Sequence, residues 1–234
     1  MSRLTVALRT LVWALPAHPA KNRMLRALGY RIHPTAIARA NLVLRVHHIS
    51  MGPGSRIGRF NLLKNLRLVS IGDHSSVGRL NVISAHPVYQ RIYPDGAALI
   101  LGRHAKITSR HQLDCSGSVT IGDFSSIAGH ETKILSHSID VRRDAQVAYP
   151  VLIGNRSFVG ARCLLLGGAV LPDRSVLGAG SVLTRTKQAP EPGLWAGVPA
   201  ALRGPIDGAW FGRSVTGTSR VYIPATGETV EDAI

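Results

Sequence analysis

A six-residue repeat of aliphatic side chains is the feature that most constrains this fold. In the C-terminal half, an aliphatic residue returns at every sixth position, at Ile153, Val159, Leu165, Leu171, Leu177 and Leu183. Glycine or proline directly follows several of them, and small residues fill the fifth position of each unit. This period matches neither an α-helix nor a hairpin meander. It fits a coil of short strands in which one large side chain per unit points inward and stacked coils pair as parallel sheets.

The same phase occurs earlier in the chain. It includes Leu101, Ile107, Leu113 and Val119, then Ile121 and Ile127, and before these Met51, Ile57, Leu63, Ile71, Val77 and Ile83. We therefore predict an all-β solenoid over residues 34–187. The phase slips once, because Lys133 occupies the expected inward position and Ile134 replaces it. We interpret this slip as a β-bulge that re-aims the side chain after it.

The two ends of the chain lack the repeat. Within residues 1–33, a helical spacing relates Leu4, Leu8, Leu11 and Leu15. This spacing predicts a short N-terminal helical cap that covers the open edge of the first coil. Residues 188–234 are predicted to be an irregular C-terminal tail, either one terminal hairpin or a loose segment.

Two polar segments rich in proline or arginine interrupt the coils, at residues 86–98 and 138–150. Both are predicted to be loops that project from the solenoid. A histidine stands at the head of each, His86 and His137, three residues after an inward aliphatic residue. Both histidines are therefore expected at coil corners, where they are candidates for chemistry.

The charge and the cysteines limit the possible partners. The formal net charge is +15, from 28 Lys+Arg against 13 Asp+Glu. The arginines are scattered, with no basic helix and no interleaved aromatic residues, so we do not predict nucleic-acid binding. A basic surface also suits phosphate-rich cofactors, nucleotide-sugars and anionic membranes. Cys115 and Cys163 have no C-x-x-C spacing, so neither a structural zinc site nor a disulfide framework is expected.

Four motifs that follow one another along the chain narrow the choice of protein family. They are Asp114-Cys-Ser-Gly-Ser-Val-Thr-Ile-Gly-Asp, Ser136-His-Ser-Ile-Asp140, Tyr149-Pro-Val-Leu-Ile-Gly and Ala196-Gly-Val-Pro-Ala200. Over residues 100–204 the chain resembles the sugar O-acetyltransferases of the hexapeptide superfamily, such as galactoside and maltose acetyltransferases. The resemblance implies a left-handed parallel β-helix, a homotrimer, acetyl-CoA as acyl donor and a hydroxyl of a sugar or surface-glycan precursor as acceptor.

The resemblance also implies roles for single residues. His137 matches the general base that removes a proton from the acceptor hydroxyl, and a free imidazole with a pKa near 6.5 suits this task at neutral pH. Asp140 is a candidate to orient the ring, or else a turn residue. Asp114, His111, Asp140 and His86 are candidates for acceptor binding. The alternatives are a turn residue for Asp114 and a surface residue for His111.

Acetyl-CoA has its own set of matching positions. Gly160, Ala161 and Ala179 match small residues along the pantetheine channel. Thr184 and Arg185 match a pair near the CoA phosphates, and Arg203 lies close to another basic position. The family's acceptor-binding asparagine is absent, and Thr108 and Ser109 are its nearest equivalents. A plain galactoside is therefore not the expected acceptor.

Other functions remain open at this stage. One is an N-acetyltransferase acting on an amino sugar nucleotide, and another is a structural solenoid without activity. A zinc carbonic anhydrase with this fold would need three imidazoles, and the H-x-x-x-x-H pair it uses is absent, so we predict no metal.

The location expected for a CoA-dependent enzyme is the cytoplasm. Two features suggest loose contact with the inner face of a membrane: the apolar stretch from Leu4 to Leu15, and the basic residues Lys21, Arg23 and Arg26 after it. The competing interpretation is that the four leucines only pack on the first coil.

Overall fold

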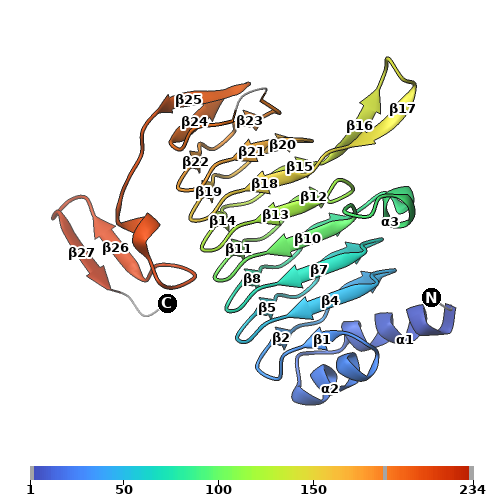
Figure 1. Ribbon diagram of the computed structural model, residues 1–234. Coiled ribbons are helices and arrows are strands. Elements are labelled where there is room, and N and C mark those ends of the chain that lie inside the picture. The colour runs from blue at the N-terminus through green and yellow to red at the C-terminus, as the bar shows by residue number, and fades with distance from the viewer. Residues whose placement is uncertain (1–2, 187–188, 232–234) are drawn as a thin grey trace.

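The computed structural model describes residues 3–186 and 189–231. The chain winds into a three-sided parallel β-helix, and each turn contributes one short strand to each side (Figure 1). We name the sides sheets A, B and C. The core lies inside this prism, as the six-residue period predicts.

The strands have these bounds. Sheet A consists of β1 (Arg31–Ile32), β4 (His48–Met51), β7 (Leu68–Ile71), β10 (Ala98–Leu101), β13 (Val119–Ile121), β18 (Val151–Ile153) and β21 (Val170–Leu171). Sheet B consists of β2 (Ile37–Ala38), β5 (Arg56–Ile57), β8 (Ser76–Val77), β11 (Lys106–Ile107), β14 (Ser126–Ile127), β19 (Phe158–Val159), β22 (Val176–Leu177), β24 (Leu194–Gly197) and β25 (Ala200–Gly204). Sheet C consists of β3 (Leu42–Leu44), β6 (Leu62–Lys64), β9 (Val82–Ser84), β12 (Gln112–Asp114), β15 (Lys133–Leu135), β20 (Leu164–Leu166) and β23 (Val182–Leu183).

Equivalent positions of successive coils stack in register. In sheet C, Ile83 pairs with Leu113, Leu113 with Ile134, and Ile134 with Leu165. All four side chains are buried, as the repeat predicts. The pairing also corrects our interpretation of the slip before Ile134. Because sheet C stays regular there, the extra residue lies in the preceding corner, where Gly129 has a φ of +67°, and no β-bulge re-aims His137.

A ladder of polar side chains closes the corner between sheets B and C. The backbone N–H of Asn61 donates to Asn41 Oδ1 at 2.8 Å, and that of Asn81 to Asn61 Oδ1 at 2.9 Å. Each amide thereby satisfies a buried backbone group that no strand pairs. The next coil has His111 at this position, and its N–H donates to Asn81 Oδ1 at 2.8 Å.

Two helices cover the first coil, α1 (Arg3–Ala14) and α2 (Pro19–Ala27). The face of α1 that packs on the solenoid carries Val12 and Trp13, both buried. Lys21 Nζ donates to the carbonyls of Trp13, Leu15 and Arg39, and burial lowers the pKa of this lysine to about 8. The helical cap is thus present, but its predicted packing face is wrong: Leu4, Leu8, Leu11 and Leu15 are all exposed.

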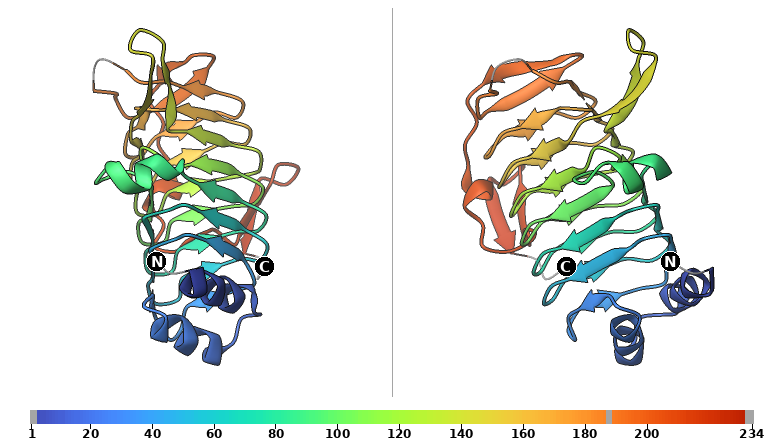
Figure 2. Two further views of the ribbon diagram at one scale, coloured as in Figure 1. Left: turned by 90° about the vertical axis from the view of Figure 1, so that its right-hand side faces the viewer. Right: turned by 45° about the vertical axis from the view of Figure 1, so that its right-hand side comes forward.

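Both insertions contain regular structure instead of irregular loop. The first forms α3 (Pro87–Ile92), and the second forms a hairpin of β16 (His137–Asp140) and β17 (Ala145–Ala148). Both project from the same edge of the solenoid, between sheets C and A (Figure 2).

After β25 the chain runs back along the solenoid through a short 3-10 helix (Ala209–Gly212) to the hairpin β26 (Arg220–Ile223) and β27 (Glu228–Glu231) (Figure 1). Arg156 Nη1 donates to the Phe211 carbonyl at 2.6 Å, and Thr216 Oγ1 to the His74 carbonyl at 2.7 Å. The tail therefore contains the hairpin alternative. The predicted boundary between residues 187 and 188 lies outside the described residues. No helix in the described part of the chain is long and apolar enough to cross a bilayer.

Candidate functional site

Two residues from successive coils form the centre of the site. Asp114 is the last residue of β12, and His137 follows β15, the next strand of sheet C. Asp114 pairs with Leu135, two residues before His137. This register brings two residues 23 positions apart into contact: His137 Nδ1 lies 2.6 Å from Asp114 Oδ2.

Asp114 is the acceptor of a converging set of hydrogen bonds. Ser116 donates its backbone N–H and its hydroxyl to Oδ1, at 3.2 and 2.6 Å. Oδ2 accepts from the Ser136 hydroxyl at 3.0 Å and from the backbone N–H of His137 at 2.9 Å. Burial disfavours the charge of this carboxyl, but the hydrogen bonds from Ser116 and His137 outweigh it, and the pKa of Asp114 is lowered.

The carboxylate fixes the state of the imidazole. An ionised Asp114 can only accept, so Nδ1 of a neutral His137 carries the proton and Nε2 keeps a free lone pair. The His137 side chain is 34% exposed, at the edge from which the two insertions project. The free lone pair of Nε2 therefore belongs to a ring that is accessible from outside the solenoid.

Residues of the first insertion surround this histidine. The ring centroids of His86 and Tyr89 lie 6.1 and 6.0 Å from that of His137. Tyr89 is buried, and its hydroxyl has no hydrogen-bond partner among the described residues. Sequence analysis missed Tyr89, although it stands three residues after His86, the spacing that places two side chains on one helical face.

Two predicted acceptor residues do not reach the base. Asp140 forms an ion pair with Arg143 inside the hairpin and accepts from the Arg142 N–H at 3.0 Å, so Asp114, and not Asp140, orients the ring. His111 is 2% exposed and continues the polar ladder, with Nε2 2.8 Å from Thr108 Oγ1 and Nδ1 accepting from the Thr132 N–H at 3.1 Å. The surface position expected for His111 is wrong, because the ladder requires a buried acceptor here, and both ring nitrogens face protein partners.

The predicted pantetheine residues lie across sheet C from His137, at the corner between sheets B and C. A Cβ atom added to Gly160 would lie 2.7 Å from the Ala179 nitrogen. One added to Gly129 would lie 2.5 Å from the Ala161 Cβ. At one position of this corner the late coils carry Ala161 and Ala179, where the earlier coils carry the larger Arg59 and Arg79.

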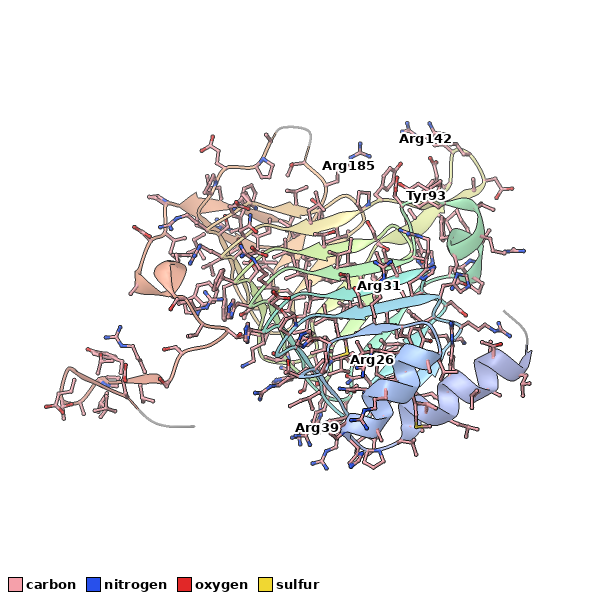
Figure 3. The ribbon with its side chains drawn as sticks, turned by 60° about the horizontal axis from the view of Figure 1, so that its bottom comes forward. Arg26, Arg31, Arg39, Tyr93, Arg142 and Arg185 are labelled. Atoms are coloured by element: carbon pink, nitrogen blue, oxygen red, sulfur yellow. The ribbon has the colours of Figure 1, made fainter. Side chains whose placement is uncertain are left out.

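The predicted phosphate contacts fall in two places. Thr184 and Arg185 follow β23, and Arg185 lies over the Tyr149 ring, 4.9 Å from its centroid. In the view of Figure 3, Arg185 lies at the same edge of the molecule as Tyr93 and Arg142, which belong to the two insertions. Arg203 is in β25, where its Nε donates to the Ala196 carbonyl at 3.1 Å. Trp195 packs in the core.

Among the described residues, no group of three or more His, Cys, Asp or Glu side chains has an arrangement that could hold a metal ion. The site consists of the Asp114–His137 pair, the rings of His86 and Tyr89 beside it, and small residues on the far side of sheet C.

Comparisons with known proteins agree with this architecture. The family model described as the hexapeptide repeat of succinyl-transferase matches residues 150–185. These residues lie in the late coils of the parallel β-helix. The chain is 31% identical over 120 residues to the galactoside O-acetyltransferase of Escherichia coli, an alignment covering 50% of this chain and 57% of the relative. The chain thus spans little more than half the length of that relative.

Solved structures with the same fold include two acyltransferases. The polysialic acid O-acetyltransferase OatWY has a TM-score of 0.53 at 20% identity, with 75% of this chain and 84% of that chain covered. A variant of AntD, an N-acyltransferase from Bacillus cereus, has a TM-score of 0.52 at 14% identity, with 83% and 92% covered. These likenesses show the fold, a left-handed parallel β-helix.

Proposed function

We propose that this protein transfers an acetyl or other short acyl group from acyl-CoA to a hydroxyl of a sugar or glycan precursor. The observation that carries the proposal is the Asp114–His137 pair, an oriented base at the edge of a hexapeptide solenoid. The similarity to galactoside O-acetyltransferase supports it, because the aligned length includes half of this chain.

The reaction follows from the state of the imidazole. His137 Nε2 accepts the proton of the acceptor hydroxyl while that oxygen forms a bond to the thioester carbonyl carbon. The carbon–sulfur bond then breaks, and the CoA thiolate receives the proton from the imidazolium. Asp114 keeps the ring in place and stabilises its positive charge between these two transfers.

The corner of small residues suits the acyl donor. Gly160, Ala161 and Ala179 have small or no side chains, which suits a narrow pantetheine arm passing along this corner. Arg185 and Arg203 are the cations we assign to the phosphates of CoA, with Thr184 beside them. Gly160, Ala161 and Ala179 lie across sheet C from His137, and this separation suits a long, extended donor, whereas Arg185 lies on the same edge as the base.

We also propose that the enzyme is a cytoplasmic homotrimer. His137 lies on an outer edge and not in a deep cleft of one chain, so a neighbouring solenoid would supply the second wall of the site. Flat-sided prisms pack well around a threefold axis, and a cyclic arrangement closes. Light scattering at micromolar concentration tests this point, and a monomeric mass would contradict it.

The decisive experiment is His137→Ala. Removing a positioned base should lower kcat/KM by about 10²–10⁴-fold while CoA affinity, measured by calorimetry, stays unchanged. His48→Ala, at an exposed histidine of sheet A, is the matched control and should keep full activity. Release of free thiol from acetyl-CoA is followed with hydroxyl and amino acceptors in parallel. A preference for amines would replace O-transfer with N-transfer, and absent CoA binding would exclude both.

A further inference from the structure

We infer that the outer face of α1 is a docking surface for an anionic membrane. Its four leucines form a stripe at helical spacing, and Leu4, Leu8, Leu11 and Leu15 are 78, 46, 66 and 42% exposed. We call this set the leucine stripe. An exposed apolar stripe of this kind marks an interaction site more often than a free surface.

The helix cannot hide the leucine stripe by rolling inward. Val12 and Trp13 on the opposite face are buried in the core, and Thr10 Oγ1 donates to the Val43 carbonyl at 2.9 Å. The buried Lys21 ammonium binds the carbonyls at the C-terminal end of α1. The stripe is therefore held outward at the first-coil end of the molecule (Figure 1).

The positive charge around the leucine stripe indicates which kind of partner binds it. Residues 1–72 contain 12 Lys+Arg and no Asp or Glu, although the whole chain has 13 acidic residues. Arg23 and Arg39 are exposed, and Figure 3 labels Arg26, Arg31 and Arg39 among the side chains at this end. A second copy would bring the same positive charge against this surface, whereas anionic lipid headgroups complement it. A leucine-rich helical face beside basic residues is the pattern of helices that lie in a membrane interface.

The apolar surface continues from the helix onto sheet C. A depression of about 420 Å³ is lined by Ala14, Leu42, Phe60 and Leu62 with their neighbours, beside the end of α1. Leu42 and Phe60 are exposed, and Arg59 stands next to Phe60. The docking surface is therefore wider than one helix, which increases the apolar area available to the acyl region of a leaflet.

The position of the docking surface also indicates a class of acceptor. This step rests on the proposed function. Four steps along sheet C separate β3, next to α1, from β15, which precedes His137. At about 4.8 Å per step, the base stands roughly 19 Å above the first coil. A glycan attached to a lipid of the same leaflet reaches this height with a few sugar units, so membrane-linked glycans are the acceptor class that this geometry favours.

Sedimentation with lipid vesicles tests the docking surface, using the full chain. At low salt the protein should bind vesicles with about 30% phosphatidylglycerol and not vesicles of phosphatidylcholine alone. The double variant Leu8→Ser/Leu11→Ser should lower the partition coefficient by at least about tenfold, because both side chains leave the apolar phase. Arg23→Glu/Arg39→Glu should weaken binding at low salt and have little effect at high salt. The matched control is Ile139→Ser/Val141→Ser, at two exposed apolar residues of the distant hairpin, and should bind as the wild type does.

Three results would overturn the inference. One is no binding to anionic vesicles at low salt, and another is binding that the leucine substitutions leave unchanged. The third is a leucine variant that loses oligomeric mass in light scattering while its vesicle binding is unaltered, since the stripe would then be covered by a second copy. Acyl transfer to a soluble acceptor is measured on the leucine and arginine variants and should not change. If transfer is absent while vesicle binding follows the leucines, only the proposed function fails.

Discussion

His86 and His137 occupy equivalent places two coils apart in this solenoid, and only one of them pairs with a carboxylate. Each lies two residues beyond a residue paired with the preceding coil of sheet C, and each begins an insertion. For His137 the paired coil supplies Asp114 opposite Leu135. For His86 the same register position, opposite Ser84, is Lys64. An ammonium cannot accept a hydrogen bond from an imidazole, so the second pair cannot form.

The two rings consequently use Nδ1 in opposite ways. His137 Nδ1 donates to Asp114, which leaves Nε2 free to accept a proton. His86 Nδ1 instead accepts from the Val88 N–H at 3.4 Å, where the side chain caps the first turn of α3. A neutral His86 with this bond carries its proton on Nε2, the atom that faces away from the cap. The residue that the preceding coil supplies, Lys64 or Asp114, thus separates a histidine that caps a helix from one whose Nε2 lone pair is free.

The corner across sheet C differs between these coils as well. Near the coil of His86 it carries arginine, phenylalanine and leucine side chains, and above His137 it carries Ala161 and Ala179. We propose that the smaller residues of the later coils leave room for the pantetheine arm. The base and the proposed donor path thus occur together only in the C-terminal half.

The largest effect within this comparison is expected from Asp114→Asn. An amide has one acceptor oxygen where the carboxylate has two, so its NH₂ group would face hydrogen-bond donors from Ser116 or from Ser136 and His137. We expect kcat/KM to fall by about 10²–10⁴-fold, because the ring loses the partner that fixes its tautomer. The free energy of unfolding should fall by about 1–3 kcal/mol because buried donors lose their acceptor. Steady-state kinetics and urea unfolding measure the two effects.

Asp123→Asn is the control for this change, since Asp123 pairs with Arg103 on the surface, at a distance of 2.9 Å. This control should keep full activity. An Asp114→Asn enzyme with wild-type kcat/KM would show that His137 needs no orienting carboxylate, and the contrast with His86 would lose its meaning.

Some parts of this site could be predicted from the sequence and others could not, for physical reasons that differ from residue to residue. The six-residue period marks inward positions directly, so the solenoid and the corner position of both histidines were predictable. The Asp114–His137 contact depends on the register between two coils, which the unequal corner before Ile134 conceals. The leucine stripe was misassigned because helical spacing reveals an apolar face but not whether that face points inward. His111 was predictable in principle, since it follows Asn41, Asn61 and Asn81 at the same corner position.

A third histidine, His111, differs from both because it affects the stability of the fold. Burial lowers the pKa of His111 to about 4, with a further contribution from His130, and Nδ1 faces the Thr132 N–H. The unfolded chain, with a histidine pKa near 6.5, therefore binds more protons than the folded one between these values. The contribution of His111 to the free energy of unfolding is therefore fully present above about pH 6.5 and decreases as the pH falls toward 4. At pH 5 this residue alone should cost about 2 kcal/mol relative to pH 7.

His111→Asn tests that statement, because asparagine occupies the same position in three preceding coils and its amide oxygen can accept from Thr132. We expect the variant to lose less stability than the wild type between pH 7 and pH 5, by about 2 kcal/mol, in denaturant unfolding at both pH values. Activity at neutral pH should be unchanged. Equal losses in both proteins would mean that His111 is not the acid-sensitive group of the ladder.

The smallest effect is expected from His86→Ala, the counterpart of the base substitution. Its ring lies beside His137, with centroids 6.1 Å apart, but its Nδ1 is used in the helix cap and it has no carboxylate partner. We therefore expect kcat/KM to fall by less than about tenfold, mainly through a higher KM for the acceptor, since a wall of the acceptor site is removed and the proton-accepting atom is not. The KM for acyl-CoA should stay unchanged because the proposed donor path lies across sheet C.

His86→Asn is the matched variant: it restores a side-chain acceptor for the Val88 N–H and separates loss of the cap from loss of the ring. A decrease in kcat of about 10²-fold or more in both variants, with the KM of the acceptor unaltered, would show that His86 shares the proton transfer, and the difference between Lys64 and Asp114 would then not explain why one histidine is the base.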